Sequence, residues 1–247
     1  MNSCLPIGAR CERQEPPRVH ATFYLTRRRG YKMSSMDPLL AEQLAYYRAV
    51  AGEYKVDAHA TRELTEALEA FRPAGDILEL ACGPGAWTEI LLRHGSTVTA
   101  VDAAPEMLAR AKARVGDERV RFIQADLFTW RPDRRYDFIF FGFWLSHVPE
   151  DRFESFWSFI GDSLQPGGRI FFVDDNRRTR AELIEGESSS TIVRRLSDGS
   201  TYRAVKVPHQ PAALEARLRN LGWCIRVRPT SGPFFVGAGT RAVPRPG

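Results

Sequence analysis

The chain has 247 residues, of which 43% are hydrophobic, and its formal net charge at pH 7 is +5. This length and composition predict one folded domain with a substantial core. No apolar run approaches the ~20 residues that a membrane-spanning helix needs, so we expect no membrane partner.

The excess positive charge lies entirely within residues 1–35, which hold seven Lys and Arg against two Glu. In residues 36–247, 28 Lys and Arg balance 28 Asp and Glu. We therefore expect a disordered basic head and an electrically neutral fold, which argues against a nucleic-acid partner. We also hypothesise that the working protein begins at Met33 or Met36.

The cysteines and histidines show no metal-ligand spacing, so we expect a mechanism without a metal. The four cysteines form no paired set either, and we expect free thiols in the cytoplasm. The sequence does not exclude a homodimer. The cysteines are Cys4, Cys11, Cys82 and Cys224.

Residues 36–72 predict a helical cap ahead of the first strand. A capping residue and a first-turn proline open the segment that starts at Ser35, and this helix is expected to continue through Val50. A second helix is expected over residues 61–71, after a short link from Gly52 to Ala60.

The most informative segment covers residues 77–88, with the sequence ILELACGPGAWT. A short apolar run breaks into Gly-x-Gly, which predicts a buried strand, a tight turn and the start of a helix. Gly83 and Gly85 allow a ligand to lie against the backbone where the first helix amides point outward. The next predicted strand ends at Asp102, a position suited to binding a ribose diol. These features indicate a nucleoside cofactor.

The same segment departs from a dinucleotide fingerprint. That fingerprint needs a third glycine, and Thr88 occupies its position, while Pro84 stiffens the turn. The carboxylate of Glu79 would repel a pyrophosphate and attract an ammonium group. A nicotinamide dehydrogenase is therefore disfavoured, and a ribose joined to an ammonium describes S-adenosylmethionine.

This segment resembles motif I of the class I S-adenosylmethionine-dependent methyltransferases, with Ala81 in place of the first glycine. The resemblance covers residues 40–240 and follows the order of that family. It implies that Asp126 meets the adenine amino group and that an aromatic residue of the cap, among Tyr46, Tyr47 and Tyr54, touches the methionine carboxylate. The predicted cofactor-binding residues are Tyr46, Arg48, Glu79, Ala81, Cys82, Gly83, Gly85, Trp87, Thr88, Asp102, Ala103, Met107, Asp126, Leu127, Phe141 and Gly142.

The remaining core elements follow in the order that this resemblance implies. A proline-initiated helix is expected over residues 104–111, an alternating strand over 120–127 and a fully buried central strand over 136–143. A Pro-Gly-Gly turn leads into the fifth strand over residues 165–173. The cofactor-binding core is thus expected over residues 73–175.

Substrate chemistry is expected after the fourth strand, because open parallel sheets bind ligands beyond their carboxyl edge. The Asn-Pro-Pro-Tyr or Asp-Pro-Pro-Tyr motif of amino-group methylation is absent there. An aromatic turn followed by His-hydrophobic-Pro instead resembles small-molecule methyltransferases, including the ubiquinone and menaquinone type. Trp144 is expected to wall the reaction site. His147 is a candidate general base, and the alternative is a histidine that caps the following helix.

The last segment, residues 176–247, predicts a hairpin around Asp198-Gly199, a helix over 211–221 and two closing strands. Asp174 and Asp175 either face the substrate or cap a turn, and the arginines of the hairpin either solvate one face or hold an anionic substrate. The predicted fold is α/β: a Rossmann-like, doubly wound, mostly parallel seven-stranded sheet with an antiparallel last strand.

The predicted function is transfer of a methyl group from S-adenosylmethionine to an oxygen or carbon of a small-molecule acceptor. A nucleic-acid or protein methyltransferase is disfavoured by the neutral core and the missing Pro-Pro motif. A catalytically silent cofactor-binding protein is the remaining alternative, suggested by the short Gly52–Ala60 link.

Overall fold

The computed structural model describes residues 37–55, 57, 59–176, 178–184 and 190–242. The expected basic head, residues 1–35, and both proposed start residues lie outside this part of the chain. Among the described helices, none combines the length and apolar character needed to cross a membrane.

A seven-stranded sheet forms the centre of the fold, with the strand order β3-β2-β1-β4-β5-β9-β8. The first five strands pair in parallel, and β9 pairs antiparallel with both of its neighbours. The predicted doubly wound sheet with an antiparallel last strand is therefore confirmed. The strands are β1 (Asp76–Leu80), β2 (Thr97–Asp102), β3 (Val120–Gln124), β4 (Tyr136–Gly142), β5 (Leu164–Asp175), β8 (Trp223–Pro229) and β9 (Phe234–Arg241).

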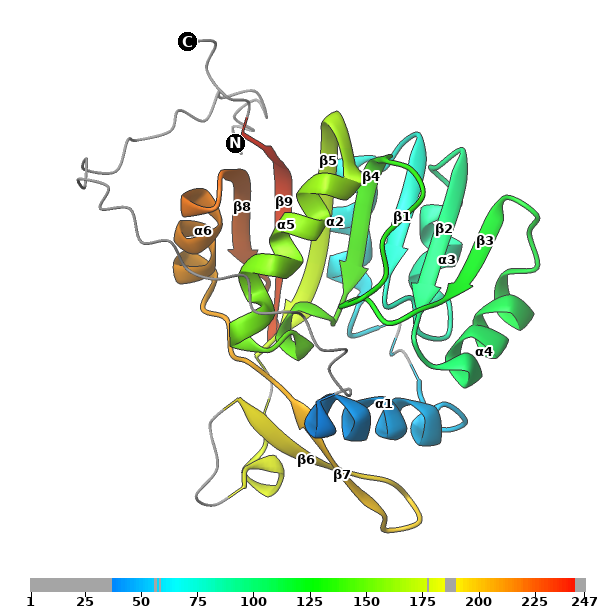
Figure 1. The fold of residues 1–247 in the computed structure, drawn as a ribbon, viewed down its shortest axis with the longest axis vertical. Helices are drawn as coiled ribbons and strands as arrows, with labels where there is room; N and C mark the ends of the chain where they lie inside the picture. Colours follow the sequence, from blue (N-terminus) through cyan, green and yellow to red (C-terminus); the bar gives the residue numbers. More distant parts are fainter. Residues whose placement is uncertain (1–36, 56, 58, 177, 185–189, 243–247) are drawn as a thin grey trace, which may run out of the picture.

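Helices cover both faces of the sheet (Figure 1). Apolar side chains of three helices pack in the core on one face of the sheet. Apolar side chains of two further helices pack in the core on the opposite face. The first face carries α2 (Arg62–Phe71), α3 (Ala86–Leu91) and α4 (Pro105–Val115), and the second carries α5 (Phe153–Ser163) and α6 (Pro211–Asn220).

The central strand β4 is buried on both sides, as its apolar run predicts. Phe138 and Phe140 belong to the core on the α2–α3 side, while Ile139 and Phe141 belong to the core on the α5–α6 side. All four side chains are fully buried. This strand therefore gives the carboxyl edge of the sheet a rigid base on which Gly142 and the following turn can be positioned.

A cap lies below the carboxyl ends of the parallel strands (Figure 1). It consists of α1 (Pro38–Val50) and the antiparallel hairpin of β6 (Thr191–Arg195) and β7 (Thr201–Val205). Asp37 caps α1, and its side chain accepts a hydrogen bond from the Leu39 amide. The short helices η1 (Leu145–His147), η2 (Glu150–Arg152) and η3 (Arg180–Glu182) complete the described elements.

The boundaries of β3 and β5 differ from those that the sequence predicts. The strand expected over residues 120–127 ends at Gln124, because Asp126 initiates a turn: its side chain accepts from the Phe128 amide and its carbonyl accepts from the Trp130 amide. In addition, β5 begins at Leu164, ahead of the Pro-Gly-Gly turn, and a register shift opposite Tyr136 and Phe138 accommodates the extra residues.

Candidate functional site

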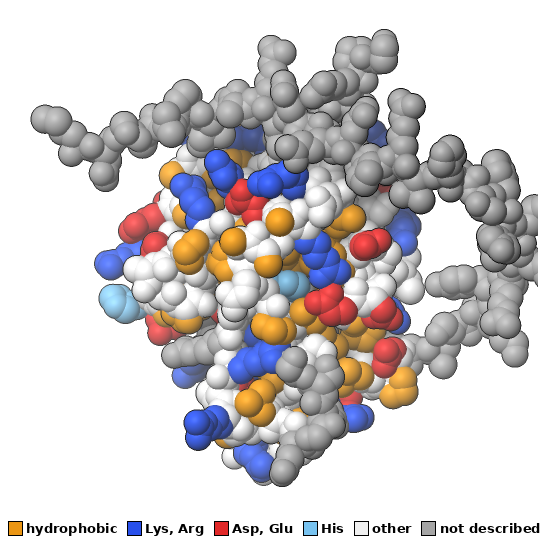
Figure 2. Space-filling view, turned by 90° about the vertical axis from the view of Figure 1, so that its left-hand side faces the viewer, with side chains coloured by type: hydrophobic (Ala, Val, Ile, Leu, Met, Phe, Trp, Pro, Cys, Tyr) orange, Lys and Arg blue, Asp and Glu red, His pale blue; other side chains and the backbone are white. Residues whose placement is uncertain are grey.

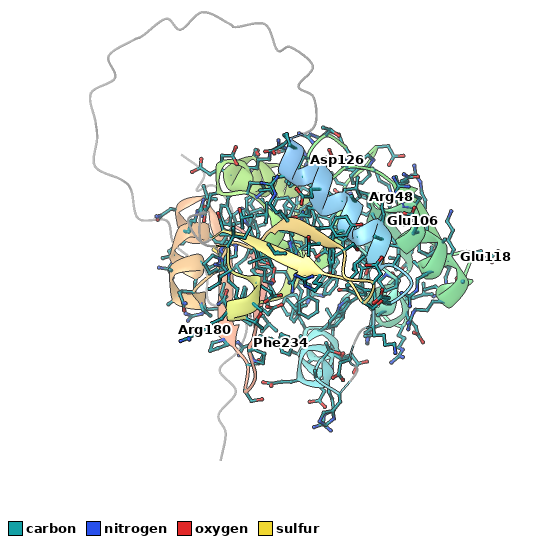
Figure 3. The ribbon with its side chains drawn as sticks, turned by 90° about the horizontal axis from the view of Figure 1, so that it is seen from below. Arg48, Glu106, Glu118, Asp126, Arg180 and Phe234 are labelled. Carbon is teal, nitrogen blue, oxygen red and sulfur yellow. The ribbon has the colours of Figure 1, made fainter. Side chains whose placement is uncertain are left out.

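A cavity lies between the carboxyl edge of the sheet and helix α1. Its volume is about 870 Å³, including its open mouth. Viewed from below, α1 crosses the carboxyl edge beside the hairpin, with Asp126 near one end of the helix and Arg48 and Glu106 near the other (Figure 3). The cavity is lined by Leu40, Gln43, Leu44, Tyr47, Tyr54, Ala81, Gly83, Asp102, Ala103, Met107, Asp126, Leu127, Phe128, Gly142, Phe143, Trp144 and His147.

Ten of the predicted site residues line this cavity, although they come from four separate segments of the chain. They are Ala81, Gly83, Asp102, Ala103, Met107, Asp126, Leu127, Gly142, Trp144 and His147. The other predicted residues do not line it; they are Tyr46, Arg48, Glu79, Cys82, Gly85, Trp87, Thr88 and Phe141.

The loop after β1 has the backbone geometry that its glycines predict. Ala81, Gly83 and Gly85 all have positive φ angles, of 53°, 52° and 80°. A Cβ atom at Gly83 would meet nothing within 4 Å, whereas one at Gly85 would lie 3.0 Å from Ala111 in α4. Gly83 thus leaves room on the cavity side, and Gly85 allows the loop to pack against α4.

Two carboxylates face the cavity from the ends of neighbouring strands. Asp102 accepts hydrogen bonds from the Gly83 and Ala104 amides, both at 2.8 Å. Each oxygen of Asp102 keeps a second lone pair, so the carboxylate can still accept from a ligand diol. Burial raises the pKa of Asp102, although these amide hydrogen bonds oppose the shift. Asp126 is half-buried and holds its own turn through the Phe128 amide.

Glu79 lies behind the glycine loop instead of on the cavity wall. Thr88 donates its hydroxyl proton to one carboxylate oxygen at 2.6 Å. The other oxygen is buried and has no hydrogen-bond partner within the described structure. Burial is the main cause that raises the pKa of Glu79 to about 8. A buried acid with an unpartnered oxygen is costly unless a positive group approaches it.

Tyr46 and Arg48, both predicted to bind the cofactor, lie outside the cavity. The 3.6-residue period of α1 turns Leu40, Leu44 and Tyr47 toward the cavity and directs the other two residues elsewhere. Tyr46 packs against Tyr202 of the hairpin, and exposed Arg48 forms a 2.9 Å ion pair with Glu106. Of the three tyrosines expected near the cofactor, Tyr47 and Tyr54 line the cavity and Tyr46 does not.

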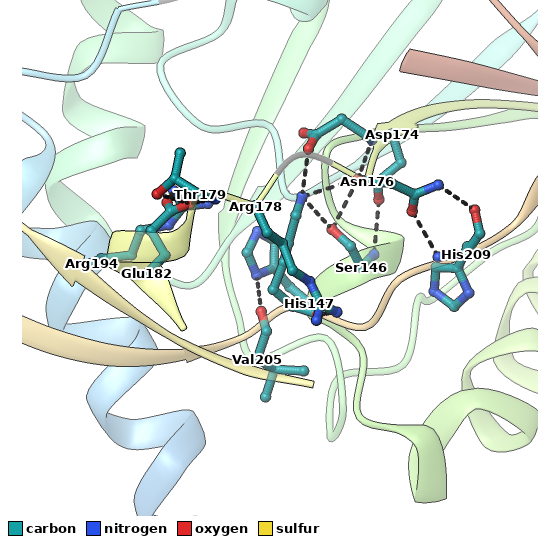
Figure 4. Close-up of polar contacts among 12 residues, drawn as sticks. Ser146, His147, Asp174, Asn176, Arg178, Thr179, Glu182, Arg194, Val205 and His209 are labelled. Atoms are coloured by element: carbon teal, nitrogen blue, oxygen red, sulfur yellow. Dashed lines mark hydrogen bonds and ion pairs between the residues drawn. The ribbon is translucent and has the colours of Figure 1, made fainter. Parts of the chain in front are cut away.

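His147 lies in the turn after β4, with both ring nitrogens in hydrogen bonds. Its Nδ1 is 2.6 Å from the Val205 carbonyl oxygen (Figure 4), and its Nε2 is 2.8 Å from the Tyr47 hydroxyl. Because a carbonyl only accepts, Nδ1 carries the proton, and Nε2 accepts from Tyr47. Burial, followed by the positive charges of Lys206 and Arg194, lowers the pKa of His147 to about 3. The imidazole is neutral at physiological pH.

A buried polar network fixes the turn that carries His147 (Figure 4). The Asp174 carboxylate accepts from the Ser146 amide at 2.8 Å and from the Ser146 hydroxyl at 2.9 Å. Lys206 donates to the Ser146 hydroxyl at 3.1 Å and pairs with Asp175 at 3.1 Å. Of the two sequence interpretations of Asp174, the structure therefore supports the turn-capping one.

Aromatic side chains form the rest of the cavity wall. The Trp144 ring packs beside Phe128, and the Phe143 ring meets Phe234 edge to face. Phe128 and the apolar residues of α1 were missed from the sequence. The capping residue and first-turn proline of α1 predicted where the helix begins, not which of its side chains reach the cavity.

The described residues contain no group of three or more His, Cys, Asp or Glu side chains placed to hold a metal ion. On the face drawn in Figure 2, the Lys and Arg side chains are interspersed with Asp and Glu.

Residues 77–168 match a family described as a methyltransferase domain. A trans-aconitate 2-methyltransferase from Streptomyces avermitilis is 35% identical over 162 residues, which are 61% of this chain and 58% of that protein. A ubiquinone biosynthesis O-methyltransferase from Xylella fastidiosa is 32% identical over 152 residues, 59% of each chain. The chain thus spans about three fifths of the length of these curated relatives.

A solved DhpI-SAM-HEP complex is 40% identical, with a TM-score of 0.73, and the match covers 83% of this chain and 99% of that one. The chain belongs to the class I S-adenosylmethionine-dependent methyltransferases. The cofactor of this methyltransferase family is S-adenosylmethionine, as its residues predicted.

The cavity of this methyltransferase fits such a cofactor. The open space beside Gly83 leaves room for a ligand against the backbone. Asp102 accepts one amide hydrogen bond on each oxygen and keeps acceptor capacity for a ribose diol. No described Lys or Arg side chain lines the cavity, which agrees with a cofactor that carries no phosphate groups.

Proposed function

We propose that this methyltransferase transfers a methyl group to an oxygen or carbon of a small-molecule acceptor. The main support for this proposal is one cavity whose two sides are lined by different kinds of residue. Carboxylates and the glycine loop form one side, and aromatic rings with His147 form the other. The α1 helix lies over this cavity, which suits a small acceptor better than a polymer.

The carboxylate side would hold the cofactor. Asp102 would accept from the ribose hydroxyls, and Asp126 from the adenine amino group, with the Leu127 backbone beside the ring. When bound, the cofactor supplies an electrophilic methyl group on a positively charged sulfur. The aromatic faces of Trp144 and Phe143 favour a cation beside them, and Gly142 keeps the backbone open there.

The aromatic side would hold the acceptor, with His147 as the final acceptor of its proton. His147 is neutral, so its Nε2 lone pair is in the state that a base requires. A pKa of about 3 makes it a weak base. Such a base suffices when proton transfer follows methyl transfer, because a newly alkylated hydroxyl is strongly acidic.

An acceptor whose attacking oxygen is already ionised is a second candidate. The names of two relatives, trans-aconitate 2-methyltransferase and malonyl-[acyl-carrier protein] O-methyltransferase, agree with acidic acceptors. Such an acceptor would need no base, so replacing His147 would leave its methylation unchanged.

The remaining alternatives have weaker support. A nucleic-acid acceptor calls for a broad basic face, whereas residues 36–247 are electrically balanced. A silent cofactor-binding protein would show cofactor binding without methyl transfer to any acceptor class. We also propose a cytoplasmic location, supported by cysteines without paired spacing. Light scattering would show whether two copies of the chain form a homodimer.

Calorimetry on Asp102→Ala tests the cofactor site. We expect S-adenosylmethionine affinity to fall more than tenfold, because a hydrogen bond to a charged group contributes about 1.5–3 kcal/mol. Asp133→Ala is the matched control, since it removes an exposed carboxylate that pairs with Arg121 outside the cavity. Unchanged affinity in Asp102→Ala, or tight binding of NAD alone by the wild type, would refute the assignment.

A further inference from the structure

The hydrogen bonds of His147 leave one route for a proton to reach it. Nδ1 is held in its protonated form by the Val205 carbonyl, so Nε2 is the ring atom that can accept a proton. That atom already receives the hydroxyl of Tyr47 at 2.8 Å. A proton delivered to Nε2 in this arrangement therefore comes from the oxygen of Tyr47.

Tyr47 is placed to pass such a proton on. Its ring stands edge-on to the imidazole, with centroids 5.6 Å apart and planes at 87°. Both side chains line the cavity. A phenol oxygen that donates its proton keeps lone pairs and can accept from another group. Burial raises the pKa of Tyr47 well above its usual value, so the phenol keeps its proton until that proton is passed on.

A purely structural role explains this hydrogen bond poorly, because other contacts already tether α1. Gln43 accepts from the Val205 amide at 2.9 Å, and Glu42 pairs with Arg203 at 3.0 Å on the same hairpin. Arg48 joins the far end of α1 to Glu106. The Tyr47 bond differs from these three contacts in one respect: it joins two titratable groups on the wall of the cavity.

We propose that Tyr47 is a catalytic residue that accepts the proton of the acceptor and passes its own proton to His147. The proposal rests on methyl transfer to a protonated acceptor, as proposed above. The acceptor oxygen bonds to the methyl carbon as the methyl–sulfur bond breaks. Its proton moves to Tyr47 Oη, and the Tyr47 proton moves to His147 Nε2. The positive charge lost at sulfur thus reappears on the imidazole, and no free phenolate forms.

The test combines Tyr47→Phe, His147→Gln and the double variant with a matched control, Tyr202→Phe. Tyr202 packs in the hairpin against Tyr46 and does not line the cavity. Calorimetry measures S-adenosylmethionine binding. Turnover is measured with radiolabelled S-adenosylmethionine on two panels of acceptors. The first panel contains aliphatic alcohols and phenols, and the second contains carboxylates and phosphates.

We expect each single variant to lose roughly 10²-fold in kcat on hydroxyl acceptors, the range of general acid–base catalysis, with cofactor affinity unchanged. The double variant should be no slower than the slower single variant, because the two groups act in series. Tyr202→Phe should match the wild type. Additive losses, a weakened cofactor affinity that explains the loss, or a wild-type rate in Tyr47→Phe would overturn the proposal.

The outcome separates this inference from the proposed function. Methylation confined to carboxylates and phosphates, unaffected by Tyr47→Phe, would overturn the relay while leaving the methyltransferase assignment intact. Failure of the wild type to bind the cofactor would overturn both. Failure to methylate any member of either panel would overturn the relay and the proposed transfer to oxygen.

Discussion

Backbone strain at single residues marks the carboxyl edge of the sheet. Ala81 and Phe143, which both line the cavity, have positive φ angles of 53° and 56°. This conformation costs a residue with a Cβ atom roughly 1–2 kcal/mol. The two positions follow β1 and β4, whose carboxyl ends meet at the cavity. Two of the three described non-glycine residues with positive φ thus lie where the backbone turns beside the cavity, and the third, Arg72, ends α2.

Ala81→Gly tests the cost of that strain. Glycine adopts a positive φ without a steric penalty, although it gains entropy in the unfolded chain. We expect the free energy of unfolding to rise by roughly 1 kcal/mol, measured by urea denaturation. Ala109→Gly, on the exposed side of α4, should instead lower it by about 1 kcal/mol, the usual cost of glycine inside a helix. A change in unfolding free energy of the same sign in both variants would contradict the proposed strain at Ala81.

At the scale of elements, the geometry of the site depends on hydrogen bonds that connect the end of β5 to η1 and η1 to the cap hairpin. The last residues of β5 accept hydrogen bonds from η1, and η1 contacts β7 through His147 and Ser146. Three segments far apart in the chain are thus fixed to one another below the sheet. The network is built from buried charged groups, which are costly when one partner is lost.

A double-mutant cycle on Asp174 and Lys206 tests whether their ion pair stabilises the fold. Both side chains are buried, so Asp174→Asn should lower the free energy of unfolding by about 3 kcal/mol, within the range for breaking a buried pair. Lys206→Met removes the opposite charge, and the double variant should lose clearly less than the two single losses combined. Strict additivity of the losses, measured by urea denaturation, would show that the two groups do not interact.

At the scale of the whole molecule, buried titratable groups make stability depend on pH. Glu79 has a folded pKa of about 8, above its unfolded value of about 4.3, so the folded state holds an extra proton between these values. His147 acts in the opposite sense below its unfolded pKa of about 6.5, where only the unfolded chain binds its proton. Between pH 6.5 and 8 the effect of Glu79 therefore dominates.

We expect the ligand-free protein to lose stability as pH rises from 6.5 to 8, by at most about 1.4 kcal/mol per pH unit. Glu79→Gln should flatten this slope, because the amide does not titrate. Unfolding free energies from urea denaturation at several pH values measure it. If the unfolding free energy of Glu79→Gln still falls as pH rises, another titratable group causes the pH dependence.

The sequence by itself determined the parts of the site that depend on local backbone chemistry and chain order. The glycine loop, the acids at the ends of β2 and β3, and the buried β4 were predicted because each is specified by residues a few positions apart. The mostly parallel seven-stranded sheet with an antiparallel last strand was expected from the family resemblance that these motifs carry.

Tertiary structure alone decided which side chains reach the cavity. The selection of Tyr47 over Tyr46 depends on the rotation of α1 against the hairpin, and this rotation is set by packing between segments about 150 residues apart. The tautomer of His147 likewise follows from the carbonyl of Val205, a partner 58 positions away. Such contacts form only when distant segments meet, and a sequence pattern contains no signal for their orientation.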